Sequence, residues 1–119
     1  MKKEKGCGPN VPVAQALNLL DLTSYVDGTI VSRTVAENAA GSLTLFAFDR
    51  NQGVSEHSAP YDAYVFVLDG ELRLKIGGKA VVARAGQLVA MPANVPHALH
   101  AETPAKMLLA MLRVQPVQA

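Results

Sequence analysis

The 119-residue chain has no tryptophan, a single cysteine and almost no excess charge. Cys7 has no intramolecular disulfide partner, so a reducing, cytoplasmic setting fits the composition best. The formal net charge is +1, and no basic stripe interleaved with aromatic residues argues for a nucleic-acid partner. No stretch approaches the ~18 consecutive apolar residues that span a bilayer, so we expect no contact with a membrane.

Aromatic residues are also scarce, which limits what can fill the core. Half of the residues are hydrophobic but only 5% are aromatic, so Val, Leu, Ala and Met must supply the interior. The length fits one domain that buries roughly two thirds of its unfolded surface. Residues 1–12, which are rich in Lys and Gly, are expected to form a flexible lead-in. Residues 13–119 are expected to form the folded domain.

No long helical periodicity is present, and short strand-like runs follow one another between turn signals. Residues 13–20 are compatible with one or two helical turns or with an extended arm. The run 71–76 alternates charged and apolar residues, as a strand with one wet face does. The predicted strands are 29–35, 42–48, 64–68, 71–76, 80–83, 87–91, 97–101 and 106–114. Strands at intervals of about ten residues predict an all-β barrel or sandwich.

Two histidines fall in separate β segments. His57 follows a predicted turn at 49–53, and His97 opens the predicted strand 97–101. Because side chains alternate faces along a strand, His57 should share its face with Ser55 and Ala59. By the same rule His100 should point away from the face that carries His97. The chemistry of the protein then depends on whether His57 and His97 meet.

The stretches around these histidines resemble the two sequence motifs of the cupin family, over about residues 40–113. The matching positions are His57 and Gly70 in the first motif, and Gly86, Pro92 and His97 in the second. The resemblance implies an all-β cupin fold, a double-stranded β-helix or jelly-roll barrel, in a single domain. It is closest to small single-domain bacterial cupins without a defined activity.

The usual metal site of that family has three histidines and one glutamate, and this chain departs from it. Ala59 stands where the second histidine belongs, and Ala63 stands where the glutamate belongs. The resemblance implies a divalent metal, Zn, Fe, Mn or Ni, at His57 and His97. Two imidazoles alone hold such an ion weakly. The alternatives are a polar pair that hydrogen-bonds a ligand, a neighbour or water inside an apolar barrel, or a metal-free histidine base.

Seven residues are candidates for ligand binding: His57, His97, Arg33, Val65, Leu99, Met107 and Met111. An inward-pointing Arg33 would bind a carboxylate, whereas a solvated strand arginine is the alternative. Apolar walls with a few polar anchors are typical of small-molecule sites. The sequence therefore predicts a small-molecule-binding domain, with a metal-dependent dioxygenase or an isomerase or lyase as the alternative.

A third expectation concerns association. If residues 64–68 form a strand, then Tyr64, Phe66 and Leu68 share its outward face and offer an apolar patch. Contiguous exposed apolar patches mark interfaces. Single-domain cupins commonly pair, so the resemblance and the patch together predict a homodimer.

Overall fold

Nine strands provide nearly all the regular structure of residues 9–114, the part of the chain that the computed structural model describes. They are β1 (Ile30–Asn38), β2 (Gly41–Phe48), β3 (Gln52–His57), β4 (Tyr61–Asp69), β5 (Glu71–Ile76), β6 (Lys79–Arg84), β7 (Leu88–Met91), β8 (His97–Ala101) and β9 (Ala105–Arg113). One short 3₁₀ turn, η1 (Leu19–Asp21), precedes them. The prediction of an all-β domain is confirmed.

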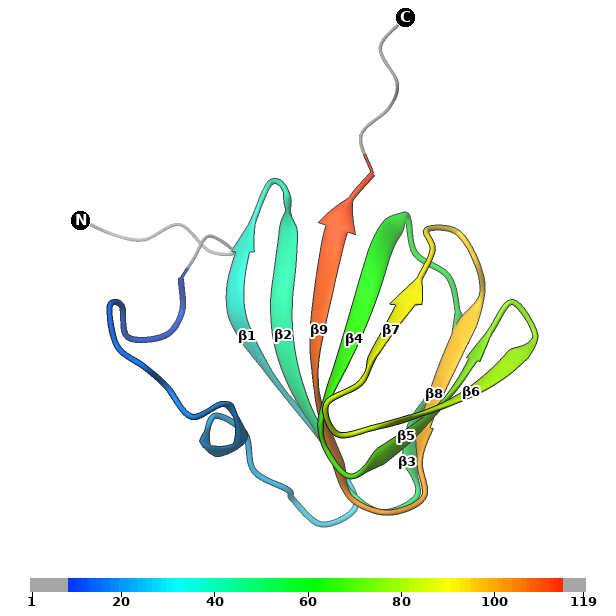
Figure 1. Cartoon of the computed structure of the whole chain (residues 1–119), viewed down its shortest axis with the longest axis horizontal. Coiled ribbons are helices and arrows are strands. Elements are labelled where there is room, and N and C mark those ends of the chain that lie inside the picture. Colours follow the sequence, from blue (N-terminus) through cyan, green and yellow to red (C-terminus); the bar gives the residue numbers. More distant parts are fainter. Residues whose placement is uncertain (1–8, 115–119) are drawn as a thin grey trace, which may run out of the picture.

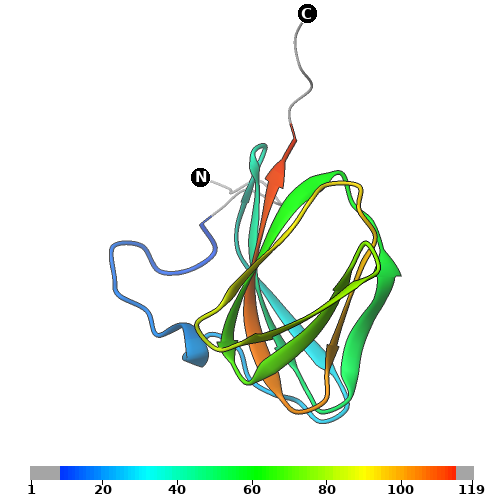
Figure 2. The same ribbon diagram turned by 45° about the vertical axis from the view of Figure 1, so that its right-hand side comes forward.

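The strands form two antiparallel sheets that face each other (Figure 1). One sheet has the order β1-β2-β9-β4-β7 and the other has the order β3-β8-β5-β6. Figure 2 shows both sheets curving around a shared interior, as in a jelly-roll barrel. The inward side chains form one apolar cluster that includes Phe48, Val67 and Leu72, all 2% exposed or less. Alternation along each strand thus gives every strand of the barrel a core face.

Most predicted strands are confirmed, and the largest difference lies before His57. A turn was expected over residues 49–53, but β3 already begins at Gln52. The turn is short because Asn51 adopts a left-handed conformation with φ 61°, which asparagine tolerates better than most residues. β4 also begins at Tyr61 rather than at Tyr64, since its first residues pair with the end of β9. β3, which carries His57, is thus a strand that was not among those predicted, and β4 starts three residues earlier than predicted.

The segment before β1 lies on the outer face of the five-stranded sheet. One of the helical turns considered for residues 13–20 is present, as η1 at the end of that range, and residues 13–18 have no regular structure. The amide of Asn10 donates to the Val35 carbonyl (2.8 Å), which ties the start of the segment to β1. Residues 1–8 of the predicted flexible lead-in, with Cys7, lie outside the described residues. Within 9–114, no helix is both long and apolar enough to cross a bilayer.

Candidate functional site

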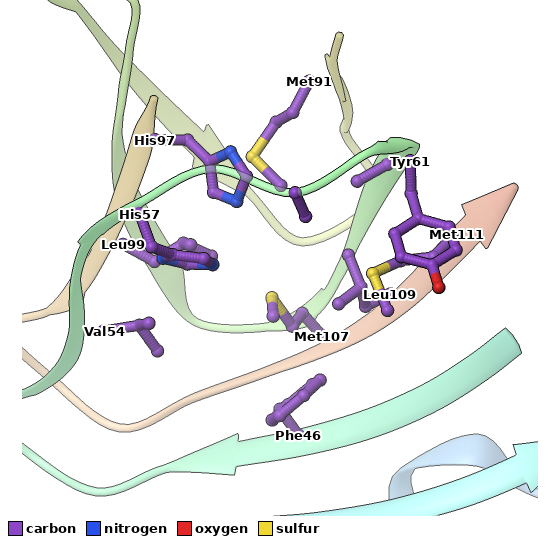
Figure 3. A pocket seen from close by; sticks show the side chains of 12 residues that line it. Phe46, Val54, His57, Tyr61, Met91, His97, Leu99, Met107, Leu109 and Met111 are labelled. Carbon is purple, nitrogen blue, oxygen red and sulfur yellow. The ribbon is translucent and has the colours of Figure 1, made fainter. Parts of the chain in front are cut away.

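A cavity of about 190 Å³ opens inside the barrel between the two sheets (Figure 3). Its walls are aliphatic, aromatic or thioether side chains apart from two histidines and a tyrosine. The lining residues are Phe46, Val54, His57, Ala59, Tyr61, Ala63, Met91, His97, Leu99, Met107, Leu109 and Met111. No carboxylate of residues 9–114 lines it. A mostly apolar hollow with a few convergent polar groups has the composition of a small-molecule site.

The two histidines meet in this cavity. His57 on β3 and His97 on β8 are direct partners across adjacent antiparallel strands. Their ring centroids are 4.4 Å apart and their planes are inclined at 70°, an edge-to-face arrangement. His97 is buried, with 7% of its surface exposed, whereas His57 is exposed. One ring therefore belongs to the cavity floor and the other faces solvent as well.

A β-bulge decides which neighbours His57 has. The register between β3 and β8 shifts between Val54 and His57, so two residues three positions apart both line the cavity. The prediction that Ser55 shares the face of His57 is wrong for this reason: Ser55 is exposed and does not line the cavity. Bulges insert an extra residue and re-aim side chains in this way. The prediction for Ala59, which does line the cavity, is confirmed.

Backbone carbonyls fix the orientation of both imidazoles. The Nδ1 atom of His57 lies 2.9 Å from the Ser55 carbonyl oxygen, and that of His97 lies 3.1 Å from the Val95 carbonyl oxygen. A carbonyl only accepts, so each Nδ1 must carry the proton and donate it. In the neutral ring the other nitrogen, Nε2, is then an acceptor. Two Nε2 lone pairs are therefore left for whatever occupies the cavity.

The structure brings together five of the seven predicted ligand-binding residues. His57, His97, Leu99, Met107 and Met111 all line the cavity. Val65 lies in the core with no exposed surface and does not line the cavity.

Arg33 is on β1 and does not line the cavity. Its Nη1 donates to the carbonyl of Leu22 in the segment that covers the outer face (3.2 Å). The structure therefore gives Arg33 a structural bond in place of the inward carboxylate contact considered from the sequence.

Several lining residues were not among the candidates. Phe46 and Val54 were missed, although Phe46 lies on the strand 42–48 and is paired with Met107 across the sheet. Met91 and Tyr61 also line the cavity. Cross-strand register was the missing information, because strand alternation gives the face of a residue but not its neighbour. The expected outward orientation of His100 is confirmed, since it is exposed and pairs with exposed Arg73.

The residues present do not fit the four-ligand divalent site of the resemblance. Ala59 and Ala63 line the cavity where a second imidazole and a carboxylate would be needed. The nearby carboxylate of Asp62 is already used, because its Oδ1 accepts from the Ala93 amide (3.0 Å). Within the described part of the chain, no group of three or more His, Cys, Asp or Glu residues is placed to hold a metal. For a metal ion, the imidazole nitrogens of His57 and His97 remain as the ligands in the cavity.

Comparison with protein families gives one match over the barrel. Residues 44–111, more than half of the chain, match the family model described as "Cupin domain". This range includes both histidines and every lining residue of the cavity. Among proteins with curated descriptions, none matches the chain.

Several solved structures share the fold. A conserved protein of unknown function from Streptococcus pyogenes is 31% identical, with a TM-score of 0.85, over 90% of this chain and 94% of that protein. A cupin 2 conserved barrel domain protein from Leptotrichia buccalis is 36% identical (TM-score 0.79) over 82% of this chain and 47% of its own. A cupin superfamily protein from Desulfitobacterium hafniense has a TM-score of 0.83 at 24% identity, covering 88% and 96% of the two chains, and supports the fold alone.

Proposed function

Because the chain belongs to the cupin family, we propose that its barrel cavity binds a small, largely apolar molecule that carries one hydrogen-bond-donating group. The single observation that carries this proposal is the pair of Nε2 acceptors, held by the Ser55 and Val95 carbonyls, inside an otherwise apolar cavity. His97 is buried and His57 also faces solvent, so a molecule in the cavity can reach both acceptors. A ligand hydroxyl or N–H would supply the hydrogen that these two acceptors lack.

The size of the cavity limits the ligand. Its volume of about 190 Å³ is somewhat larger than the ~150 Å³ that an engineered apolar cavity needs to bind benzene. One ring, or six to eight heavy atoms, is therefore the expected scale. Met107, Leu109 and Met111 would contact the apolar body, and unbranched methionines adapt to its shape. A phenol or a compact aliphatic alcohol combines this scale with a donor.

The experiment compares ligands that differ only in the donor. Thermal unfolding of the full chain is measured with phenol, anisole and benzene at matched concentrations. Phenol should raise the midpoint the most, because at ten times Kd a ligand stabilises by about 1.4 kcal/mol, or several °C for a domain of this size. Equal shifts from phenol and anisole would contradict the proposal that the two Nε2 atoms accept a hydrogen bond from the ligand.

Two variants and one spectrum complete this test. His97→Phe should abolish the preference for phenol, while His100→Phe, which alters an exposed outward histidine, should leave it unchanged. Long-range ¹H–¹⁵N spectra should show the Nδ1–H tautomer for His57 and His97. An Nε2–H tautomer at both residues would contradict the proposal independently of any ligand.

We also propose that the domain pairs with a second copy through the outer face of β4. Phe66 is 38% exposed and is the direct cross-strand partner of Leu88 on β7, which is 55% exposed. Tyr64 and Leu68 share that outward face but are only partly exposed. Adjacent apolar side chains at a sheet surface favour burial against a partner. The expected symmetric dimer would place the same patch of each copy in contact.

A further inference from the structure

The internal methionines of the chain gather at one place in the fold. The sequence has four methionines, Met1, Met91, Met107 and Met111. The three internal ones all line the barrel cavity, together with two of the three histidines. Met91 and Met107 are 2% and 3% exposed. Ordinary core filling needs apolar volume but does not need thioethers beside two imidazole acceptors.

Strand register places thioethers beside the missing carboxylate. The cross-strand partners of Ala63 are Met91 on β7 and Met111 on β9. Directly opposed residues on one face have Cβ atoms about 4.5–5.5 Å apart. The position that the resemblance assigns to a hard carboxylate ligand is thus occupied by a methyl group, and a methionine stands opposite it on each neighbouring strand. This exchange changes the kind of ion that the cavity would accept.

The rings and sulfur atoms converge from different strands (Figure 3). In that view the free ring edges of His57 and His97 point into the cavity, and the sulfur atoms of Met91 and Met107 lie on the side near the rings. The sulfur of Met111 lies at the other end, by Leu109. The two ring centroids are 4.4 Å apart, so both imidazoles stand together at one place in the cavity wall.

Charge and softness together select the ion. Among the residues that the structure describes, no carboxylate lines the cavity to offset a divalent charge, and the cost of burying an ion rises steeply with its charge. Thioethers are soft ligands that favour Cu(I), and imidazole also suits copper. We propose that the cavity binds Cu(I) through Nε2 of His57 and His97 and the thioether sulfurs of Met91 and Met107. The reducing setting that the single cysteine indicates would maintain this oxidation state.

This inference goes beyond the proposed function and is tested separately. Full-length protein is titrated anaerobically with Cu(I) in competition with bicinchoninate, a chromophoric Cu(I) chelator. Every protein in the series carries Cys7→Ala, so that the free thiol contributes no copper binding. The expected result is one Cu(I) per chain that bicinchoninate removes only in excess. Copper left wholly with the chelator at equal concentrations would overturn the proposal.

Matched substitutions within the same cavity identify the ligands. The double variant Met91→Leu/Met107→Leu should lose at least about tenfold in affinity, the lower bound seen even for outer-shell partners. Met111→Leu makes the same chemical change at the far end of the cavity and should bind as the parent does. Leucine replaces methionine with little change in volume, so these variants should fold. Equal affinities for the double variant and Met111→Leu would refute the thioether assignment.

X-ray absorption of the copper complex gives a second readout that does not depend on affinity. The parent should show sulfur in the first shell of Cu(I) beside nitrogen, and the double variant should show nitrogen without sulfur. A nitrogen-only shell in the parent would also overturn the proposal. Because Cu(I) and phenol would use the same Nε2 atoms, each should weaken binding of the other. Phenol binding without Cu(I) binding would refute this inference and leave the proposed function standing.

Discussion

Lys106 is a buried cation that pairs with no carboxylate of residues 9–114, and replacing it tests how the outer face of the barrel is covered. Its Nζ donates to the carbonyls of Leu20 (2.6 Å) and Thr23 (2.7 Å) and lies 5.0 Å from the centroid of the Tyr25 ring. Only 9% of the residue is exposed. These three contacts attach the segment before β1 to the central strand β9. Lys106→Met keeps the aliphatic stem and removes the charge and the donors.

Neighbouring contacts show what the segment covers. Arg33 on β1 and Asp69 on β4 also bond to it, and β2 lies between β1 and β9 in the sheet. The outward residues of β2, Leu45 and Ala47, are accordingly 1% and 0% exposed. Burial first, and then the hydrogen bond and charge of Asp69, raise the pKa of Tyr25, so its hydroxyl stays protonated and donates to Asp69. Loosening the segment would expose apolar surface of β2.

The free energy lost in Lys106→Met is the sum of opposing contributions. Two hydrogen bonds from a charged donor contribute about 1.5–3 kcal/mol each, and the cation–π contact adds about 1 kcal/mol. Removing the ammonium also removes its desolvation cost of several kcal/mol. We expect a net loss of about 2 kcal/mol, which corresponds to a roughly 30-fold larger equilibrium constant for opening of the segment. The free energy of unfolding should fall by a similar or smaller amount.

Hydrogen–deuterium exchange measures this loss at one amide. The Leu22 amide donates to the Leu19 carbonyl within η1 (3.2 Å) and should exchange faster in Lys106→Met. Lys75→Met, at an exposed lysine of β5, is the control and should leave the Leu22 amide unchanged. Amides in the centre of β4 should stay protected in both variants. Unchanged exchange at Leu22 in Lys106→Met would refute the attachment role of Lys106.

Three further predictions address the motif and the surface. Gly70→Ala should destabilise the domain by at least about 2 kcal/mol, since φ is +73° and a Cβ there would clash with the Pro104 carbonyl. Gly78 is also left-handed but has open space around it, so Gly78→Ala should cost less stability in urea unfolding. Equal losses of stability in the two variants would contradict the clash. Ala59→His/Ala63→Glu should raise Zn(II) affinity in calorimetric titrations, and no gain would show that the site geometry is lost. Light scattering should give a dimer that Phe66→Asp dissociates; a monomeric parent at micromolar concentration would contradict pairing.

Much of the fold was accessible from the sequence because its signals are local. The alternation in 71–76 and the bounds of 97–101 predicted β5 and β8 without error. Gly70, one of the motif positions, forms the turn between β4 and β5 and has a left-handed φ there. The prediction failed at residues 49–53, because the left-handed conformation of Asn51 shortens the turn. The turn between β2 and β3 has three residues, 49–51, where five were expected.

The site was less accessible, since it depends on register between distant strands. The sequence by itself determined an all-β barrel, two histidines in motif positions, and alanine at two ligand positions. Only the tertiary structure showed that His57 and His97 are cross-strand partners. It also showed that a bulge directs Val54, and not Ser55, toward the cavity. It also aligned Met91 and Met111 beside Ala63. The reason is physical: alternation fixes which face a side chain takes, but pairing of strands far apart in the chain fixes which side chains meet.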